Sequence, residues 1–347
     1  MSDVLIYGAY GYTGELIARE AKRKGLKAIL SGRNLKKLEK IAHETGYPFH
    51  AVDLNDRHRL VDLLSRVKVV IHCAGPFKYT ARQMIHSCLE AKTHYLDITG
   101  EYQVFEMAHA YGDEARRKKV MLLPGSGFDV VPSDCLAAHL KSFVPRANNL
   151  ELAFTSTSGF SSRGTAKTAI EGSGEGQIVR KEHQLKSYPL GQRVKKINYG
   201  PFEKISMGIS WGDVASAYFS TGIPNIEVYI GATPKQVRLF KWMHRLRFLV
   251  RMKWVKNYLK KQADKKPAGP SEVRRQKSQM YLWGKAEQDG QSKELRLITP
   301  NGYTLTYKTA VLFAEKILQG EFTPGYQTPS TAFGKDVILE IDGCSFI

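Results

Sequence analysis

The first 123 residues alternate short apolar runs with longer amphipathic segments, and this alternation limits what the chain can fold into. The six runs are rich in Val, Ile and Leu, and the five segments between them have the 3.6-residue period of a helix. Strands that are apolar throughout are buried on both faces, so the pattern predicts an α/β fold with a doubly wound parallel sheet. A mixed α+β domain is the alternative. The runs are 4–7, 28–30, 49–52, 69–73, 95–98 and 120–123, and the helical segments are 15–24, 35–45, 57–66, 80–91 and 103–119.

After Pro124 longer strands follow, with few regular crossover helices between them. Pro132 suits the first turn of a helix and Ser133 or Asp134 can cap it, so a helix is expected to run to Phe143. We therefore expect a nucleotide-binding domain over 1–130 and a substrate or dimerisation α+β domain with a mixed sheet over 131–347. In the second domain the predicted strands are 150–155, 226–231, 280–286, 295–299 and 337–341, the loops are 155–176 and 262–278, and a helix is expected at 308–318. The C-terminal helix and strand are candidates to pack back on the first domain.

A glycine-rich turn lies between the first predicted strand and the first predicted helix. Glycines allow the tight turn and a close approach to a pyrophosphate, and the free N–H groups of the helix N-terminus hold its negative charge. A glycine triplet alone is weak evidence, but here a strand precedes it, a helix follows it and a complete alternating domain surrounds it. The predicted contacts are Gly8, Tyr10, Gly11, Tyr12, Thr13 and Gly14.

The end of the second strand decides which dinucleotide fits. An acidic residue there would accept the ribose 2′-hydroxyl, whereas this chain has Arg33, which can bind a 2′-phosphate with two hydrogen bonds. The sequence therefore predicts NADP(H), with a solvated arginine as the alternative. Asp53 is placed to meet the adenine amino group, although a plain helix cap would look the same. The nicotinamide half is expected along the fourth strand end, at Cys73, Ala74, Gly75, Pro76 and Phe77.

Two further strand ends on that sheet edge are polar. One carries Tyr95 and Asp97, and the other carries Asp129. Ligands of open parallel sheets bind at the carboxyl ends of strands, so these three residues are the candidate catalytic groups. The alternative is that Asp97 and Asp129 hold their loops together by accepting hydrogen bonds from backbone N–H groups.

The cysteines and the chain start indicate an intracellular protein. The four cysteines are scattered without metal-ligand spacing, which predicts reduced thiols and no metal site. No apolar run is long enough to span a bilayer, and no leader precedes Val4. We therefore predict a cytoplasmic location.

Much of the formal net charge of +19 lies in one segment, because residues 235–277 carry fifteen Lys and Arg against two acids. One block of charge is not the pattern of a nucleic-acid groove, so no nucleic-acid partner is expected. Within 235–261, apolar residues form two helical stripes among ten cations: Leu239, Met243, Leu246, Val250 and Trp254, and Phe248, Met252, Val255 and Leu259. Such a segment suits an anionic membrane, an acyl carrier or acyl-CoA. The alternative is a packed helical hairpin whose Lys and Arg stems cover apolar surface.

The motifs above resemble those of the saccharopine dehydrogenase-like family, and most closely its trans-acting enoyl reductase branch. The matching pieces occur in order along nearly the whole chain: 8–14, 31–33, 74–77, 95–101, 127–129, 132–134, 211–213, 220–225, 269–271 and 325–329. The resemblance implies a Rossmann domain, a mixed-sheet substrate or dimerisation domain, and NAD(P)H-dependent reduction of imines or of enoyl groups.

These expectations combine into one function. The chain is predicted to be an NADP(H)-dependent oxidoreductase that reduces a C=C or C=N bond in a lipid-linked or amino-acid-derived substrate. The partners expected are a small-molecule or acyl-linked substrate, with a homodimer and a peripheral membrane contact left open. The alternative is a non-catalytic NADP(H)-binding sensor or membrane-surface scaffold, because no proton donor stands out in the sequence.

Overall fold

The computed structural model describes residues 3–157, 162–172, 175–245, 248, 252–265 and 267–347, and the chain forms two compact units. The first consists of Met1–Val131 with Tyr303–Gly334, and the second of Pro132–Gly302 with Lys335–Ile347. The sequence led us to expect two domains that are each continuous along the chain, 1–130 and 131–347. In the structure each unit instead combines two separate segments, because residues 303–334 belong to the first unit.

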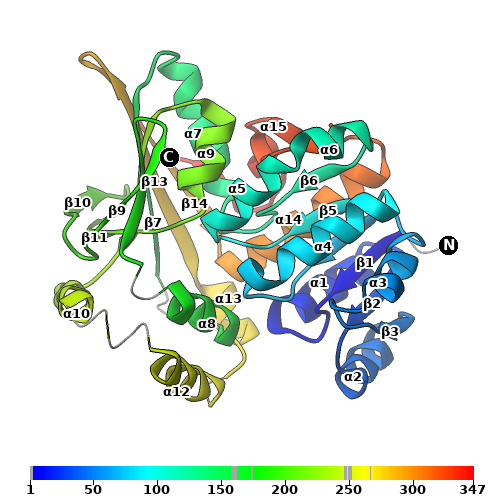
Figure 1. Ribbon diagram of the computed structural model, residues 1–347. Helices are drawn as coiled ribbons and strands as arrows, with labels where there is room; N and C mark the ends of the chain where they lie inside the picture. Colours follow the sequence, from blue (N-terminus) through cyan, green and yellow to red (C-terminus); the bar gives the residue numbers. More distant parts are fainter. Residues whose placement is uncertain (1–2, 158–161, 173–174, 246–247, 249–251, 266) are drawn as a thin grey trace. The chain divides into compact units, whose positions relative to one another are not determined.

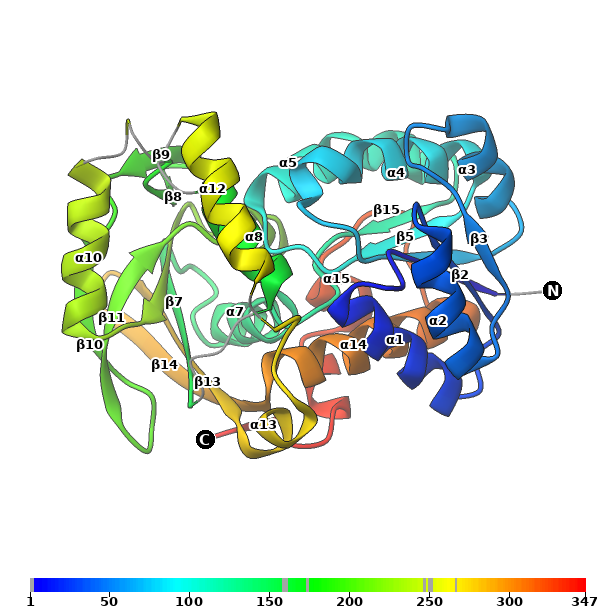
Figure 2. The ribbon, with the colours of Figure 1, turned by 90° about the horizontal axis from the view of Figure 1, so that it is seen from below.

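The first unit contains a seven-stranded sheet of order β15-β6-β5-β4-β1-β2-β3, in which every pair is parallel (Figure 1). Helices α1, α2 and α14 cover one face, and α3, α4 and α5 cover the other (Figure 2). This is the predicted doubly wound fold. The strands are β1 (Val4–Tyr7), β2 (Ala28–Gly32), β3 (Phe49–Ala51), β4 (Val69–His72), β5 (His94–Asp97), β6 (Met121–Leu123) and β15 (Gly325–Tyr326). The helices are α1 (Tyr12–Arg23), α2 (Leu35–Thr45), α3 (Arg57–Leu64), α4 (Phe77–Ala91), α5 (Tyr102–Ala110), α6 (Gly112–Arg117), α14 (Gly302–Leu318) and α15 (Pro329–Phe333).

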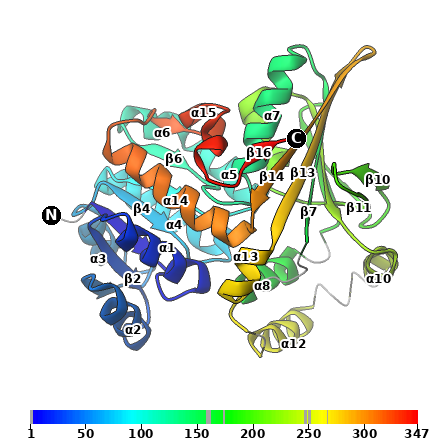
Figure 3. The ribbon, with the colours of Figure 1, turned by 180° about the vertical axis from the view of Figure 1, so that it is seen from behind.

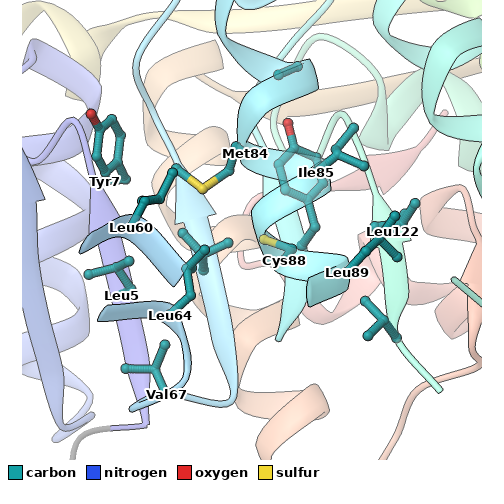
Figure 4. Close-up of a cluster of buried hydrophobic side chains, with 14 of the residues drawn as sticks. Leu5, Tyr7, Leu60, Leu64, Val67, Met84, Ile85, Cys88, Leu89 and Leu122 are labelled. Carbon is teal, nitrogen blue, oxygen red and sulfur yellow. The ribbon is translucent and has the colours of Figure 1, made fainter. Parts of the chain in front are cut away.

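One apolar cluster joins the sheet to helices α3, α4 and α5, which cover one of its faces. Leu5 of β1 and Leu122 of β6 pack with Leu60 of α3 and with Met84 and Ile85 of α4, all of them fully buried (Figure 4). Burial of a Leu, Ile or Met side chain contributes about 1.5–3 kcal/mol. This packing holds the strand ends, and therefore the loops that follow them, in fixed positions.

Three expectations for this unit need correction. The segment 103–119 is two helices, α5 and α6, which meet at Tyr111. A Cβ on Gly112 would lie 3.3 Å from the Tyr326 Cβ, so this glycine lets β15 approach closely. The seventh strand, β15, has only two residues and no apolar run that sequence could reveal. Helices α1 and α4 begin three residues before their predicted starts, so Tyr12, Thr13, Gly14 and Phe77 belong to helices.

The second unit is built on a nine-stranded mixed sheet. Strands β7 and β12 are parallel, and the other neighbouring strands are antiparallel, as the predicted mixed sheet requires. Helix α7 lies against β13, where a Cβ on Gly284 would be 2.7 Å from Leu140 Cδ1. The strands are β7 (Asn149–Ser156), β8 (Gln177–Lys181), β9 (Gln184–Tyr188), β10 (Val194–Asn198), β11 (Glu203–Ile209), β12 (Asn225–Gly231), β13 (Gln279–Gln288), β14 (Gln291–Pro300) and β16 (Ser345–Phe346), and the helices are α7 (Val131–Phe143), α8 (Arg163–Gly172), α9 (Asp213–Thr221), α10 (Pro234–Arg245), α12 (Lys253–Asp264) and α13 (Glu272–Lys277).

Three local predictions for this unit were wrong. The expected loop at 155–176 contains helix α8, whose start is stabilised by Ser162 Oγ accepting a hydrogen bond from the Thr165 N–H. The expected loop at 262–278 contains the end of α12 and all of α13, which Ser271 caps. The expected strand at 337–341 is the 3-10 helix η1 (Val337–Glu340). Val337 and Ile338 are both buried, as are the residues of the apolar strands β1 and β4, so apolar composition alone could not distinguish this helix from a strand.

The C-terminal helix α14 packs along α1 in the first unit (Figure 3). The Tyr12 and Tyr303 rings meet edge to face with their centroids 5.2 Å apart, and Lys24 Nζ lies 3.9 Å from Glu315 Oε2. Tyr303, from the far end of the chain, therefore lies beside the start of α1, where the glycine-rich turn ends.

Candidate functional site

Two glycines of the turn are required by close packing inside the protein. Gly8 has a φ of +83°, and a Cβ there would lie 2.9 Å from the Ala74 backbone nitrogen. A Cβ on Gly14 would lie 2.3 Å from the Gly8 carbonyl oxygen, so α1 can approach β1 only with glycine at that position. These glycines bring β1, the start of α1 and the loop after β4 into contact.

Gly11 has a different environment. Its backbone is extended, with φ −76° and ψ 157°, and it forms the N-cap of α1 without any side-chain hydrogen bond to the helix. Among the described residues, a Cβ there would meet one atom within 4 Å, the Gly8 carbonyl oxygen at 3.3 Å. No side chain caps the N-terminus of α1, so the positive end of its helix dipole lies where a diphosphate would bind.

The end of β2 presents unpaired positive charge beside this turn. Arg33 is exposed and has no hydrogen bond or ion pair within the described part of the chain. The Tyr10 ring packs over Gly32, where a Cβ would lie 2.6 Å from Tyr10 Cε1, and Lys37 Nζ lies 5.7 Å from the centre of that ring. The exposed Arg33 guanidinium at this edge is available to bind a phosphate next to an adenosine.

Asp53 follows β3 at the same edge. Its Oδ1 accepts hydrogen bonds from the Asn55 N–H and from Asn55 Nδ2, both at 2.9 Å, so the carboxylate also stabilises its own turn. Asp53, Tyr10 and Arg33 all act electrostatically on the Tyr7 phenol, whose pKa burial raises far above its ordinary value. The predicted adenosine residues are thus neighbours around Tyr7.

The strand register brings the remaining residues of the edge into one row. Tyr7 pairs with His72, and His72 pairs with Asp97 on the next strand. His72 is fully buried, its Nε2 lies 3.0 Å from Thr80 Oγ1, and burial lowers its pKa to about 3. A neutral His72 therefore lies beneath the loop that starts at Cys73.

The loop after β4 ends on helix α4, whose N-terminus is occupied. Glu101 accepts hydrogen bonds from the Phe77 N–H at 2.8 Å and from the Lys78 N–H at 2.9 Å, and the Phe77 side chain is buried. Burial, together with Asp97, raises the pKa of the Cys73 thiol, which stays protonated. Cys73, Ala74, Gly75 and Pro76 thus form the edge itself, whereas Phe77 supports it from the core.

Both carboxylate oxygens of Asp97 accept hydrogen bonds. Oδ2 accepts from the Tyr95 hydroxyl at 2.5 Å, and Oδ1 accepts from the N–H groups of Thr99 at 3.0 Å and Gly125 at 2.8 Å. The side chain is fully buried, and burial raises its pKa to about 6 against the opposing effect of these hydrogen bonds. Asp97 thereby ties the loop after β5 to the loop after β6.

Asp129 lies on the second of these loops and faces the first. A Cβ on Gly100 would lie 2.8 Å from Asp129 Oδ2, so the carboxyl group fits only against glycine. Burial, together with the nearby Glu101 carboxylate, raises the pKa of Asp129 to about 7. Its carboxyl group can therefore hold or release a proton near neutral pH.

The C-terminal helix α14 fixes the loop that carries Asp129. The Thr306 hydroxyl accepts from the Phe128 N–H at 3.0 Å, and the Thr309 hydroxyl donates to the Ser126 carbonyl at 2.7 Å. Sequence reasoning missed these threonines, as well as His72 and Tyr303, and it included Glu101 in the motif 95–101 without giving it a role of its own. His72 could have been found from the sequence, because it ends the β4 strand directly before Cys73. The roles of the other residues depend on tertiary contacts that no local pattern indicates.

A parallel sheet, a glycine turn with an open helix N-terminus, and an unpaired arginine at the end of the second strand define a dinucleotide-binding protein of the Rossmann class. Residues 4–123 match the family described as the saccharopine dehydrogenase NADP binding domain. This match confirms the predicted resemblance and the predicted cofactor, NADP.

Relatives with curated names agree with this family. The saccharopine dehydrogenase-like oxidoreductase of Mus musculus is 27% identical over 228 residues, covering 56% of this chain and 52% of the mouse protein. The trans-acting enoyl reductase of Mycobacterium ulcerans (strain Agy99) is 26% identical over 161 residues, covering 44% of this chain and 38% of that protein. The chain thus spans about half the length of the curated relatives it matches.

A solved structure extends the likeness to the whole fold. Apo histidine-tagged saccharopine dehydrogenase (L-Glu forming) from Saccharomyces cerevisiae superposes with a TM-score of 0.67 at 13% sequence identity. The match covers 98% of this chain and 96% of the yeast chain. At this identity the likeness supports the fold, including the mixed-sheet unit, and nothing finer.

Replacing Arg33 with alanine is expected to remove the preference for NADPH over NADH. A charge-assisted hydrogen bond to the 2′-phosphate should contribute roughly ten- to a hundredfold in affinity, and NADH lacks that phosphate. Fluorescence titration of both cofactors into the wild type and the variant measures the effect. Lys40→Ala, on the neighbouring helix α2, is the matched control. Equal binding of both cofactors by the wild type, or an unchanged preference in Arg33→Ala, contradicts the assignment.

Replacing Asp97 with alanine is expected to destabilise the protein by about 3 kcal/mol, because buried donors on Tyr95, Thr99 and Gly125 lose their acceptor. Asp97→Asn keeps one acceptor oxygen and should lose less. Thermal unfolding of both variants, with and without NADPH, measures the difference. An unchanged melting temperature together with lost turnover would instead identify Asp97 as a catalytic residue.

Proposed function

We propose that this protein is an NADPH-dependent reductase of a C=C or C=N bond, with Asp129 as the proton donor. The observation that carries the proposal is the half-buried Asp129 carboxyl group against Gly100, on the same sheet edge as the glycine turn. A carboxyl group with a pKa of about 7 is suited to general acid catalysis at neutral pH.

The reaction balances with this donor. When bound, NADPH would supply the hydride that adds to one atom of the double bond and would thereby be oxidised to NADP⁺. The Asp129 carboxyl group gives its proton to the other atom, is left as a carboxylate, and is protonated again from solvent. Burial of Asp129, together with the nearby Glu101 charge, raises its pKa to about 7, so the donor is partly protonated near neutral pH.

The neighbouring side chains have positioning roles in this proposal. Asp97 holds Thr99 and Gly125, which frame the two loops. Glu101 holds the start of α4 beneath the edge. Thr306 and Thr309 hold the backbone on both sides of Gly127, so α14 sets the direction of the Asp129 loop. This assigns the predicted residues Asp97 and Tyr95 to support rather than to proton transfer.

Two substrate classes are consistent with the relatives. The M. ulcerans protein is named for reduction of an enoyl group, and the yeast structure is of an enzyme named for saccharopine, whose dehydrogenation forms L-Glu. We therefore propose a lipid-linked enoyl group or an imine formed from an amino acid as the substrate. Reduction of either substrate requires the same transfer of a hydride and a proton.

A turnover assay tests this function. Loss of NADPH absorbance is followed with a panel of enoyl thioesters and with mixtures of amino acids and keto acids that form imines. We expect turnover with at least one class, and none with Asp129→Asn. Tight NADPH binding without turnover across both classes would favour the alternative, a non-catalytic NADP(H) sensor.

A further inference from the structure

Helix α10 of the second unit is anchored on one face only. Val237 is buried and Phe240 is half-buried in an apolar cluster that includes Met207 of β11. Residues two positions apart on a helix point about 200° away from each other. Leu239 and Trp242 therefore project away from the cluster, and their side chains are 53% and 61% exposed.

Helix α12 repeats this arrangement with an ionic anchor. Lys256 Nζ donates to the Glu171 carbonyl oxygen at 2.7 Å, and both Lys256 and Lys260 pair with the buried Glu171 carboxylate of α8. Trp254 and Tyr258, two positions before these lysines, lie on the opposite face and are 68% and 58% exposed. The anchor holds α12 so that its aromatic side chains face away from α8.

The exposed aromatic residues of these helices include the most exposed tryptophans that the structure describes. Two of its four tryptophans are Trp242 and Trp254, and large exposed apolar side chains incur a hydration cost unless a partner covers them. Phe248 and Met252, between the two helices, are also exposed. Leu246 and Val250, which the predicted apolar stripe also included, lie outside the described residues.

Cations accompany the aromatic residues on the outer faces. Lys235, Arg238 and Lys241 are exposed on α10, and Lys261 lies one further turn along the stripe of Trp254 and Tyr258. None of these four cations has an ion pair or hydrogen bond within the part of the chain that the structure describes. Both helices lie at one end of the second unit (Figures 1 and 3).

We propose that the outer faces of α10 and α12 bind the surface of an anionic phospholipid bilayer. Tryptophan and tyrosine prefer the boundary between headgroups and acyl chains, and unpaired lysines and arginines are attracted to anionic headgroups. Charge complementarity selects this occupant, because the segment from Lys235 to Lys261 carries ten cations and no acid. The contact proposed is peripheral. No described helix is long and apolar enough to cross a bilayer.

Co-sedimentation of the full-length protein with vesicles tests this surface. We expect binding to vesicles of equal parts phosphatidylcholine and phosphatidylserine, and little binding to phosphatidylcholine alone. Binding should weaken steeply between low and physiological salt, because attraction of exposed charges fades within a Debye length of about 8–10 Å. Binding that depends on neither the lipid charge nor the salt concentration overturns the proposal.

Charge reversal locates the surface. The triple variant Lys235→Glu/Arg238→Glu/Lys261→Glu should lose vesicle affinity by at least roughly a hundredfold, since each cation near an anionic surface contributes about fivefold. The control, Lys68→Glu/Lys119→Glu/Lys181→Glu, makes the same change in net charge at exposed sites elsewhere and should lose much less. Equal losses in both variants would mean that net charge alone attracts the protein, which overturns the site.

Tryptophan fluorescence tests the aromatic contact separately. Brominated phosphatidylcholine in anionic vesicles should quench Trp242 and Trp254, and Trp242→Phe/Trp254→Phe should abolish the quenching while both helices stay folded. If vesicles never bind and the charge-reversal variant melts at a lower temperature, the segment is a packed hairpin. If an acidic acyl carrier protein binds instead of vesicles, the partner is a protein. Either outcome overturns the proposal.

Discussion

Replacing Gly11 with valine is expected to reduce NADPH affinity by at least roughly a hundredfold while the protein stays folded. The extended backbone at Gly11 is accessible to any residue, and its Cβ would meet one protein atom within 4 Å among the described residues. The side chain would therefore occupy the space in which the pyrophosphate approaches the N-terminus of α1. Isothermal titration with NADPH, together with a melting curve, measures both parts of the expectation.

Gly14→Val is the informative control for Gly11→Val. Its Cβ would lie 2.3 Å from the Gly8 carbonyl oxygen, so α1 must shift and the protein should lose about 1–3 kcal/mol of stability or more. One valine should therefore impair binding and the other should impair folding, although the two positions are separated by less than one turn of α1. A well-folded Gly11→Val that still binds NADPH tightly would place the diphosphate elsewhere.

Replacing Asp129 with asparagine is expected to lower kcat by roughly 10²–10⁴-fold, the usual contribution of a general acid, with NADPH affinity unchanged. In the wild type, kcat for reduction should be highest below pH 7 and fall as the pH rises through about 7, because the donor loses its proton there. Stopped-flow and steady-state rates across the pH range, with a substrate from the panel, measure this. Asp113→Asn, which alters an exposed carboxylate on α6, is the control.

The same substitution separates catalysis from stability. The pKa of Asp129 in the folded protein, about 7, lies above the ordinary 3.8, so folding favours the protonated carboxyl group. Its contribution to stability is present at low pH and is lost as the pH rises toward 7. Asp129→Asn should therefore melt no lower than the wild type above pH 7, even though turnover falls. A kcat that rises above pH 7, or a variant with full activity, would contradict the proposed role.

The local sequence determined the dinucleotide half of this protein. Each strand end there follows its own apolar run, so the glycine turn, Arg33 and the Cys73–Pro76 loop could be placed from neighbouring residues alone. A parallel sheet brings all carboxyl ends to one edge, which is why Asp97 and Asp129 could be assigned to it before the fold was known. The family match to residues 4–123 confirms the class of fold and the cofactor.

Tertiary structure decided what each of these residues does. Asp97 and Asp129 both follow strands in the sequence, but in the structure Asp97 accepts three hydrogen bonds that tie two loops together, and Asp129 lies against Gly100 with a pKa raised to about 7. The threonines that hold the Asp129 loop come from α14 and lie 178 and 183 residues along the chain from their partners Phe128 and Ser126. The outward faces of α10 and α12 likewise depend on Glu171 and on the Val237 cluster. The local sequence indicates the hydrophobic period and the polarity of a segment. The hydrogen-bond partners, burial and pKa of a residue depend on other residues that only folding brings next to it.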